Sequence, residues 1–239
     1  MSVISSRENP RVRRWRELTR DARERRKQRR AIIEGENLIS AFLASGKTVE
    51  SLLLGKSAAE RLEFDSLVQR SGKAPVVLSD ALFRYVSDTE TPAGIAAEIA
   101  IPAGHQRLKT AEACIFLDAI QDTGNVGTIL RSAAAFGIRH AVLGKGCADA
   151  WSPKVLRAGA GAHFSLQISE NADLVEVIAE FAGSIACTVP RGGVPVSEAV
   201  LADRTGWLFG AEGQGVSEAL AARAALRVTI PMPGGAESL

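Results

Sequence analysis

This sequence contains few of the residues on which disulfide scaffolds and metal centres depend. Its 239 residues include only three cysteines and three histidines, spread along the chain as Cys114, Cys147, Cys187, His105, His140 and His163. An odd number of distant cysteines forms neither a disulfide framework nor a zinc-ligand set. The cysteines are therefore predicted to be reduced thiols of a cytoplasmic protein, and no metal is expected.

Long apolar runs are also missing. A transmembrane helix needs about 20 consecutive apolar residues, and the apolar stretches here are shorter and interrupted, so no membrane contact is expected. The N-terminus is charged and has no apolar signal region. With 46% hydrophobic and 23% charged residues, the composition is that of a globular protein with one large or two smaller domains.

Acidic residues are scarce at the start of the chain, where basic residues are concentrated. Residues 1–30 contain twelve Lys and Arg against four Asp and Glu, a balance of +8, while the rest of the chain carries −6. This concentration suits a polyanion such as nucleic acid. Because Glu17, Asp21 and Glu24 lie within helical reach of arginines, a solvated helix with some ion pairing remains the alternative.

The same segment is predicted to be helical. Asn9 is a suitable N-cap and Pro10 fits the first turn. On this helix Trp15 and Leu18 are expected to face a partner surface, while the arginines face outward.

Strand-like and helix-like segments alternate along the rest of the chain. Up to residue 100 they describe a small α/β unit, which includes one expected helix over residues 57–72. A linker-like stretch follows at residues 101–112, and a second alternating series begins at residue 113. This order predicts an α/β fold with a mostly parallel sheet covered on both faces. The predicted domains are residues 1–100 and 113–239.

Three glycine-rich loops follow predicted strands of the second series. They read DTGNVG (122–127), GAEGQG (210–215) and PMPGGAESL (231–239). In parallel sheets, ligands bind where the carboxyl ends of the strands meet such loops. No GxxxxGK[ST] phosphate loop is present, and RAGAGAHF (157–164) lacks both the third glycine and the following helix of a dinucleotide fingerprint.

One cation lies alone in the helix-like run that follows the first of these loops. Gly127, Thr128, Arg131 and Ala135 fall roughly on one helical face, where small residues let a ligand approach. The alternative is a structural arginine that is paired with one carboxylate to satisfy a buried charge.

The three loops together resemble a known family. NVGTILRSAAAFG (125–137) resembles the first motif, Asn-x-Gly-x-x-x-Arg, of the SpoU family of RNA ribose methyltransferases in the SPOUT class. LFGAEGQGVSE (208–218) resembles the second motif, and IPMPGGAESL (230–239) the start of the third. ISSRENPRVRRWREL and AIIEGENLI resemble the family's RNA-binding extension, and WSPKVLRAGAGAHF (151–164) resembles its segment between motifs, so the likeness covers nearly the whole chain.

The resemblance implies both a reaction and a fold. The methyl donor would be S-adenosylmethionine, and the acceptor a ribose 2′-hydroxyl of RNA, with ribosomal RNA favoured by the N-terminal extension. The C-terminal domain would contain a trefoil knot and would form a homodimer whose interface builds the active site. In the family the third motif continues into a final helix, whereas this sequence stops at Leu239. The C-terminal helix is therefore expected to be absent from this chain, with the knot incomplete.

The resemblance also implies roles for single residues. Arg131 would lie at the reacting hydroxyl, Asn125 would hold Arg131 or the ribose, Glu212 would orient the arginine, and Ser238 would lie near the centre. The cofactor would be held, mainly through backbone groups, by Gly210, Ile230, Met232 and Leu239. Candidate RNA contacts are Arg11, Arg13, Arg14, Lys154 and Arg157.

Several alternatives stay open at this point. Arginine is a poor general base because its pKa lies above about 12, so Arg131 is also a candidate to stabilise a developing alkoxide or to grip a phosphate. Asn125 and Glu212 are also candidates for plain helix capping. For the whole chain, the alternatives are an RNA-binding module without catalysis and a small-molecule α/β enzyme whose basic helix only adds solubility.

Overall fold

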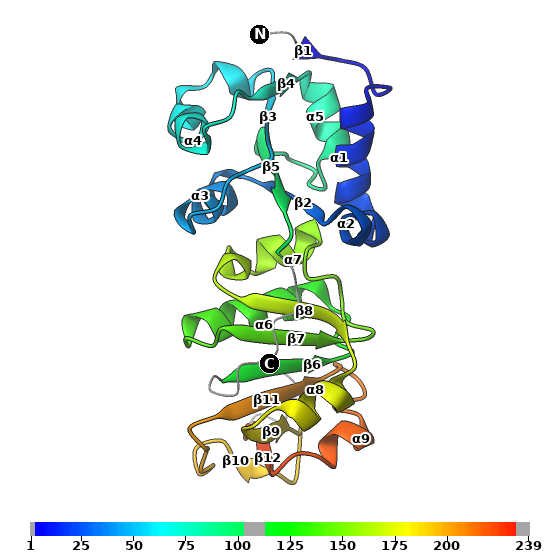
Figure 1. Ribbon diagram of the computed structural model, residues 1–239, viewed down its shortest axis with the longest axis vertical. Coiled ribbons are helices and arrows are strands. Elements are labelled where there is room, and N and C mark those ends of the chain that lie inside the picture. Colours follow the sequence, from blue (N-terminus) through cyan, green and yellow to red (C-terminus); the bar gives the residue numbers. More distant parts are fainter. Residues whose placement is uncertain (1–2, 103–112, 233–239) are drawn as a thin grey trace. The chain divides into compact units, whose positions relative to one another are not determined.

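The computed structural model of the chain describes residues 3–102 and 113–232. Contacts between Cα atoms divide the chain into two units. The N-terminal unit comprises Met1–Ala103 and Trp151–Phe164, and the C-terminal unit comprises Gly104–Ala150 and Ser165–Leu239. Figure 1 labels the elements of both units. No helix in the described part of the chain combines the length and the apolar character needed to cross a bilayer.

The N-terminal unit is built on a mixed five-stranded sheet. Its order is β1 (Val3–Ile4), β4 (Val76–Leu78), β3 (Ser51–Gly55), β5 (Ile95–Ala100) and β2 (Arg30–Glu34). Strand β5 is antiparallel to both β2 and β3, whereas β3 and β1 pair with β4 in parallel. The helices of this unit are α1 (Pro10–Arg20), α2 (Ala22–Gln28), α3 (Glu36–Ala44), α4 (Asp65–Ser71), α5 (Asp80–Val86) and α7 (Pro153–Ala158).

Helix α1 begins as the sequence predicts, but its apolar face is not free for a partner. The Asn9 side chain accepts a hydrogen bond from the backbone N–H of Arg11, and Pro10 occupies the first turn. Trp15 and Leu18 are fully buried in a core that includes Leu53 and Phe83. The expectation that they face a partner is therefore wrong, because the unit's own sheet and helix α5 cover them.

Residues 57–72 do not form one helix. Two short 3-10 turns, Ala58–Glu60 and Leu62–Phe64, precede α4. Arg61 between them is extended, with φ −95° and ψ 123°. The buried residues Ala58 and Phe64 are six positions apart, a spacing that does not place them on one helical face.

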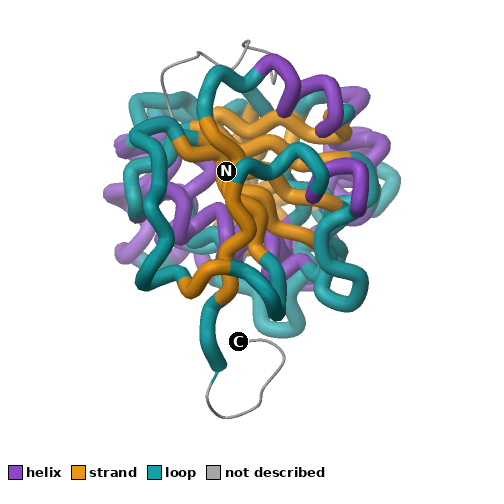
Figure 2. The backbone as a smooth tube through the Cα atoms, turned by 90° about the horizontal axis from the view of Figure 1, so that it is seen from below, coloured by secondary structure: helices purple, strands orange, loops and turns teal. Residues whose placement is uncertain are grey.

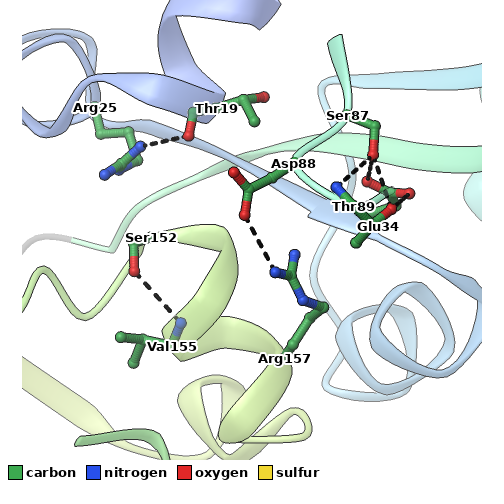
Figure 3. A network of polar contacts seen from close by, with 9 residues as sticks. All are labelled: Thr19, Arg25, Glu34, Ser87, Asp88, Thr89, Ser152, Val155 and Arg157. Atoms are coloured by element: carbon green, nitrogen blue, oxygen red, sulfur yellow. Dashed lines mark hydrogen bonds and ion pairs between the residues drawn. The ribbon is translucent and has the colours of Figure 1, made fainter. Parts of the chain in front are cut away.

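The segment Trp151–Phe164 belongs to the N-terminal unit by its contacts, although its position in the sequence places it within the predicted domain 113–239. The ring of Phe164 packs edge-on against Phe42 at 5.1 Å, and Lys47 Nζ donates to the Phe164 carbonyl at 2.7 Å. Arg157 Nη2 donates to Asp88 Oδ2 at 3.1 Å (Figure 3).

The C-terminal unit confirms the predicted parallel α/β fold. Its seven strands run in the order β10 (Val194–Pro195), β12 (Leu226–Thr229), β9 (Ser184–Thr188), β11 (Thr205–Gly210), β6 (Cys114–Asp118), β7 (His140–Gly144) and β8 (Gln167–Ala172). All of these neighbours pair in parallel. Figure 2 shows strands running through the interior with helices to either side.

The helices of this unit are α6 (Thr123–Ala135), α8 (Leu174–Glu180) and α9 (Glu218–Ala221). In Figure 1, α8 lies in front of the sheet and α6 behind it. Helix α8 buries Leu174 and Ile178 against Phe116 and Leu208. Helix α6 buries Val126 and Leu130. This packing fixes the loops that follow β6 and β11, the two neighbouring strands in the middle of the sheet.

Candidate active site

Strands β6 and β11 end side by side, so the loops that follow them begin at one place. The register pairs Gly210 with Asp118. After β6 the chain enters α6, whose N-cap is Asp122. The Asp122 Oδ1 atom accepts a hydrogen bond from the Asn125 backbone N–H at 2.8 Å. The predicted first and second motifs therefore meet at the carboxyl edge of the sheet.

A hydrogen bond joins the two motifs. Asn125 Nδ2 donates to Glu212 Oε1 at 2.9 Å, and the Asp122 backbone N–H lies 3.4 Å from the same oxygen. The pKa of Glu212 lies below its ordinary value, chiefly because the Asn125 amide donates to the carboxylate. Asn125 and Glu212 are 87 positions apart in the sequence, and the structure brings their side chains together.

The loop after β11 is held at a second point by a residue that the sequence analysis missed. Asp118 Oδ2 accepts a hydrogen bond from the Ser217 backbone N–H at 2.8 Å, at the start of α9. Asp118 is the last residue of β6, and a carboxylate that ends an apolar strand at the ligand-binding edge was the available signal. Within the loop, the backbones of Ala211 and Gly215 exchange two hydrogen bonds of 2.8 and 3.1 Å.

Gly210 is required by the loop itself. A Cβ atom at this position would lie 2.1 Å from both the Gly215 carbonyl carbon and the Val216 nitrogen. Gly213 is different, because a Cβ atom there would meet nothing within 4 Å. The structure thus gives a packing reason for Gly210, beside the cofactor contact that the sequence predicts.

Arg131 is exposed on α6, away from the buried face that carries Val126 and Leu130. Among the residues that the structure describes, it makes no hydrogen bond and no ion pair. The alternative of a buried arginine paired with a carboxylate does not describe this side chain. Glu212, predicted to orient Arg131, has its hydrogen bond with Asn125 instead.

The third predicted loop is only partly within the described residues. Ile230 follows β12 and is 52% exposed, and Met232 is half-buried. Ser238 and Leu239, predicted near the centre and at the cofactor, lie outside the described residues.

Two predicted RNA contacts on helix α1 already have carboxylate partners. Arg13 pairs with Glu8, and both side chains are mostly exposed. Arg14 Nη2 lies 2.5 Å from Glu98 Oε2, whose side chain is 1% exposed and also accepts from Trp15 Nε1 at 2.8 Å. A buried carboxylate needs such a cation, so Arg14 stabilises the fold by compensating the charge of Glu98.

The other three predicted RNA contacts differ in their surroundings. Arg11 is exposed, with its guanidinium carbon 5.0 Å from the centre of the Trp15 ring. Lys154 on α7 is exposed. Arg157 is half-buried and bonded to Asp88.

Across residues 3–102 and 113–232, no three His, Cys, Asp or Glu side chains gather in a way that could hold a metal ion. Cys114 and Cys187 are buried free thiols, and Cys147 is a half-buried one. Burial raises the pKa of all three thiols.

Comparisons with known proteins agree with this geometry. The chain is 33% identical over 241 residues to the 23S rRNA (guanosine(2553)-2′-O)-methyltransferase RlmP of Bacillus subtilis, an alignment that covers 100% of this chain and 94% of the relative. The fold matches the SpoU methyltransferase AviRb of Streptomyces viridochromogenes in complex with AdoMet, with a TM-score of 0.86, 25% identity, and coverage of 97% of this chain and 92% of that one.

A second solved structure, described as an RNA 2′-O ribose methyltransferase, matches with a TM-score of 0.80 and 28% identity over 100% of this chain and 93% of that one. The profile of the MRM3-like substrate binding domain matches residues 9–97. The profile of the SpoU rRNA Methylase family matches residues 112–239, more than half of the chain. The chain therefore belongs to the SpoU rRNA methylase family.

Proposed function

We propose that this protein transfers the methyl group of S-adenosylmethionine to a ribose 2′-hydroxyl of RNA, with ribosomal RNA as the substrate. The observation that carries the proposal is the hydrogen bond between Asn125 and Glu212, which joins two family motifs at the carboxyl edge of the sheet. The names of the relatives support it, since one methylates a 23S rRNA ribose and another is an AdoMet complex.

The described residues fit the cofactor in chemistry. S-adenosylmethionine, when bound, supplies an electrophilic methyl group on a sulfonium. The exposed Ile230 and half-buried Met232 offer apolar surface for its adenosine part after β12. Gly213 leaves open space beside the backbone of the second motif. This arrangement suits a ligand that is held mainly through backbone groups.

The chain's own residues have two tasks in the reaction. They must hold the ribose oxygen in line with the methyl group, and they must accommodate the loss of the hydroxyl proton. Arg131 is unpaired among the described residues, and its guanidinium has five donors in a planar fork. We assign it the stabilisation of the developing alkoxide. Asn125, fixed by Glu212, holds the ribose side of the site.

Other features remain proposals. We assign residues 1–100 to RNA binding and residues 113–239 to methyl transfer, joined by a linker at 101–112, and the match to a substrate binding domain supports the first assignment. The homodimer, the trefoil knot and the cytoplasmic location rest on the family resemblance and the composition. Sedimentation of the purified protein over a range of concentrations tests the homodimer.

A methyl-transfer assay tests the function. The full chain is incubated with methyl-labelled S-adenosylmethionine and unmodified 23S rRNA, and the digested nucleosides are analysed by mass spectrometry. We expect a 2′-O-methylated nucleoside at one position. RNA binding without methylation would favour the module without catalysis, and a failure to bind RNA would favour the small-molecule enzyme.

A further inference from the structure

The basic residues of α1 are not equivalent. Arg14 pairs with Glu98, and Arg13 pairs with Glu8 near the start of the helix. No carboxylate in the described part of the chain forms an ion pair with Arg16, with Arg20 one helical turn further on, or with Arg7 before the helix. We call these three residues, with Tyr85, the arginine cluster.

Tyr85 on α5 brings two of these arginines together. The guanidinium carbon of Arg7 lies 4.5 Å from the centre of the Tyr85 ring, and that of Arg16 lies 4.7 Å from it. Such contacts hold a guanidinium in place without neutralising its charge. Because two cations already occupy the ring, it is not open for base stacking. The cluster therefore presents fixed positive charge rather than an aromatic platform.

The charge of Arg16 is poorly compensated by the protein. Its Nη1 atom is buried and has no hydrogen-bond partner among the described residues. Burial and then the charge of Arg20 lower the pKa of the Arg16 guanidinium, although Tyr85 and Asp88 act in the opposite direction. Two cations at positions i and i+4 of a helix repel each other. An anion bound here would accept a hydrogen bond from Nη1 of Arg16 and would reduce the repulsion between Arg16 and Arg20.

Asp88, the carboxylate that acts on Arg16, is hydrogen-bonded to a different arginine. Its Oδ2 atom accepts from Arg157 at 3.1 Å. Its neighbours are fixed by Glu34, which accepts from the Ser87 hydroxyl at 2.6 Å and from the Thr89 hydroxyl at 3.1 Å (Figure 3). Asp88 therefore pairs with Arg157 and leaves the arginine cluster with its positive charge.

We propose that Arg7 and Arg16, which lie over the Tyr85 ring, bind a backbone phosphate of the RNA substrate together with Arg20, one helical turn beyond Arg16. The inference rests on the proposed function and names the contact that the N-terminal unit makes with its substrate. A phosphodiester has the required single negative charge and several acceptor oxygens, and a guanidinium fork can bind two of them at once. A contact of this kind strengthens binding and positions the RNA without reading its sequence.

The test compares two arginines of the same helix. Arg20 belongs to the cluster, and Arg13 is paired with Glu8; both are exposed, so neither substitution threatens the core. The B. subtilis relative is named for guanosine 2553 of 23S rRNA. The probe is an in vitro transcript of the 23S rRNA region around that nucleotide. Affinities of the full chain without cofactor are measured over a range of salt concentrations.

We expect Arg20→Gln to weaken binding and to flatten the slope of log affinity against log salt by about 0.7 to 0.9, the value for one lost phosphate contact. Arg13→Gln should change the slope by much less, because Arg13 is already paired with Glu8; that result would count against the sequence-based prediction that Arg13 contacts RNA. Arg16→Gln should act like Arg20→Gln, with its unfolding temperature measured beside it because Arg16 is half-buried. The loss should be the same for transcripts of other sequence.

Equal effects of Arg13→Gln and Arg20→Gln, or no effect of Arg20→Gln, would overturn the site. A loss confined to one RNA sequence would also overturn it, because it would indicate a base contact. Methyl transfer by the wild-type chain is measured in parallel. If the wild type transfers no methyl group while the Arg20 effect persists, the proposed function fails and the phosphate site stands.

Discussion

At the scale of single residues, Arg131 is the side chain on which the proposed chemistry depends. It is exposed on α6, and no carboxylate pairs with it in the described part of the chain. An arginine that stabilised the fold would be expected to have such a partner. Its surroundings therefore fit a group that is kept available for the substrate.

Replacing Arg131 tests this assignment. We expect Arg131→Ala to lower kcat by about 10²-fold or more, the usual cost of removing a donor from an anion-stabilising site. Folding should be unaffected because the side chain is exposed. Arg131→Lys should not restore activity, since lysine lacks the planar fork. Arg223→Ala, at another exposed arginine of the same unit, is the control, and activity of Arg131→Ala near that of the control would refute the role.

The hydrogen bond from Asn125 to Glu212 predicts a dependence on pH. Because the pKa of Glu212 is depressed in the folded protein, the bond stabilises the loop fully above the carboxyl's unfolded pKa of about 4.3. This contribution is lost as the pH falls through the lower folded pKa. In Asn125→Ala, an NMR titration should find the pKa of Glu212 raised toward its ordinary value. An unchanged pKa would show that the bond is not formed in solution.

The sequence identifies both partners of this bond but not the bond itself. Asn125 and Glu212 stand in separate motifs, and their contact depends on β11 pairing with β6, which local patterns do not encode. Arg14 is the opposite case, because the sequence predicts a phosphate contact and the structure pairs it with Glu98. Glu98 is the lone acidic residue of an apolar strand, and such a residue implies a nearby cation.

At the scale of elements, the loop after β11 offers a matched pair of glycines. Gly210→Ala places a Cβ atom into the backbone of Gly215 and Val216, so the loop must move. We expect a loss of about 1–3 kcal/mol in the free energy of unfolding, together with weaker S-adenosylmethionine binding. Gly213→Ala should change the free energy of unfolding little, because its Cβ atom would meet open space. Urea unfolding compares the stability of the two variants, and calorimetry measures cofactor binding by Gly210→Ala; equal losses of stability in the two variants would contradict the prediction.

Helix α1 offers a second matched pair. Arg14→Ala leaves the carboxylate of Glu98 buried with fewer partners, so we expect the N-terminal unit to lose about 1–3 kcal/mol of stability. Arg13→Ala breaks an exposed pair with Glu8 and should cost less than about 1 kcal/mol. Denaturant unfolding distinguishes them. Equal losses would mean that Glu98 is satisfied without Arg14.

Elements were predicted best where the apolar period was regular. Strands β6, β7 and β9 and helix α6 follow the sequence pattern closely. Strand β8 lies at Gln167–Ala172, three residues after the predicted FSLQIS, and the two-residue strand β10 is not predicted. Helix α5 is not predicted either, although Ser79 caps it by accepting from the Leu82 backbone N–H. Its seven residues, DALFRYV, are too few to display a helical period, so their conformation is set by packing on α1 and the sheet.

At the scale of the whole molecule, the N-terminal segment is both a source of charge and a part of the core. Removing residues 1–30 would flatten the salt dependence of RNA binding, as the charge balance predicts. It would also remove Val12, Trp15 and Leu18, all fully buried, from the N-terminal unit. Hydrogen exchange should therefore show β3 and β5 losing protection in the deleted protein. S-adenosylmethionine binding, which we assign to the other unit, should persist.

Retained protection of β3 and β5 in that protein would mean that α1 contributes little to the core. Loss of cofactor binding would mean that the two units depend on each other. Substitution of single arginines is the cleaner test of charge, because it leaves the apolar face of α1 in place.

Because Trp151–Phe164 is part of the N-terminal unit, this unit cannot fold completely until that segment has been synthesised. This unit gains α7, the Arg157–Asp88 ion pair and the packing of Phe164 on Phe42 only from residues that follow β6, α6 and β7 in the chain. A ribosome that has translated the first 103 residues has therefore delivered an unfinished unit. The unit that is assigned to bind ribosomal RNA becomes complete only after β6 and β7, two of the seven strands of the other unit, have been synthesised.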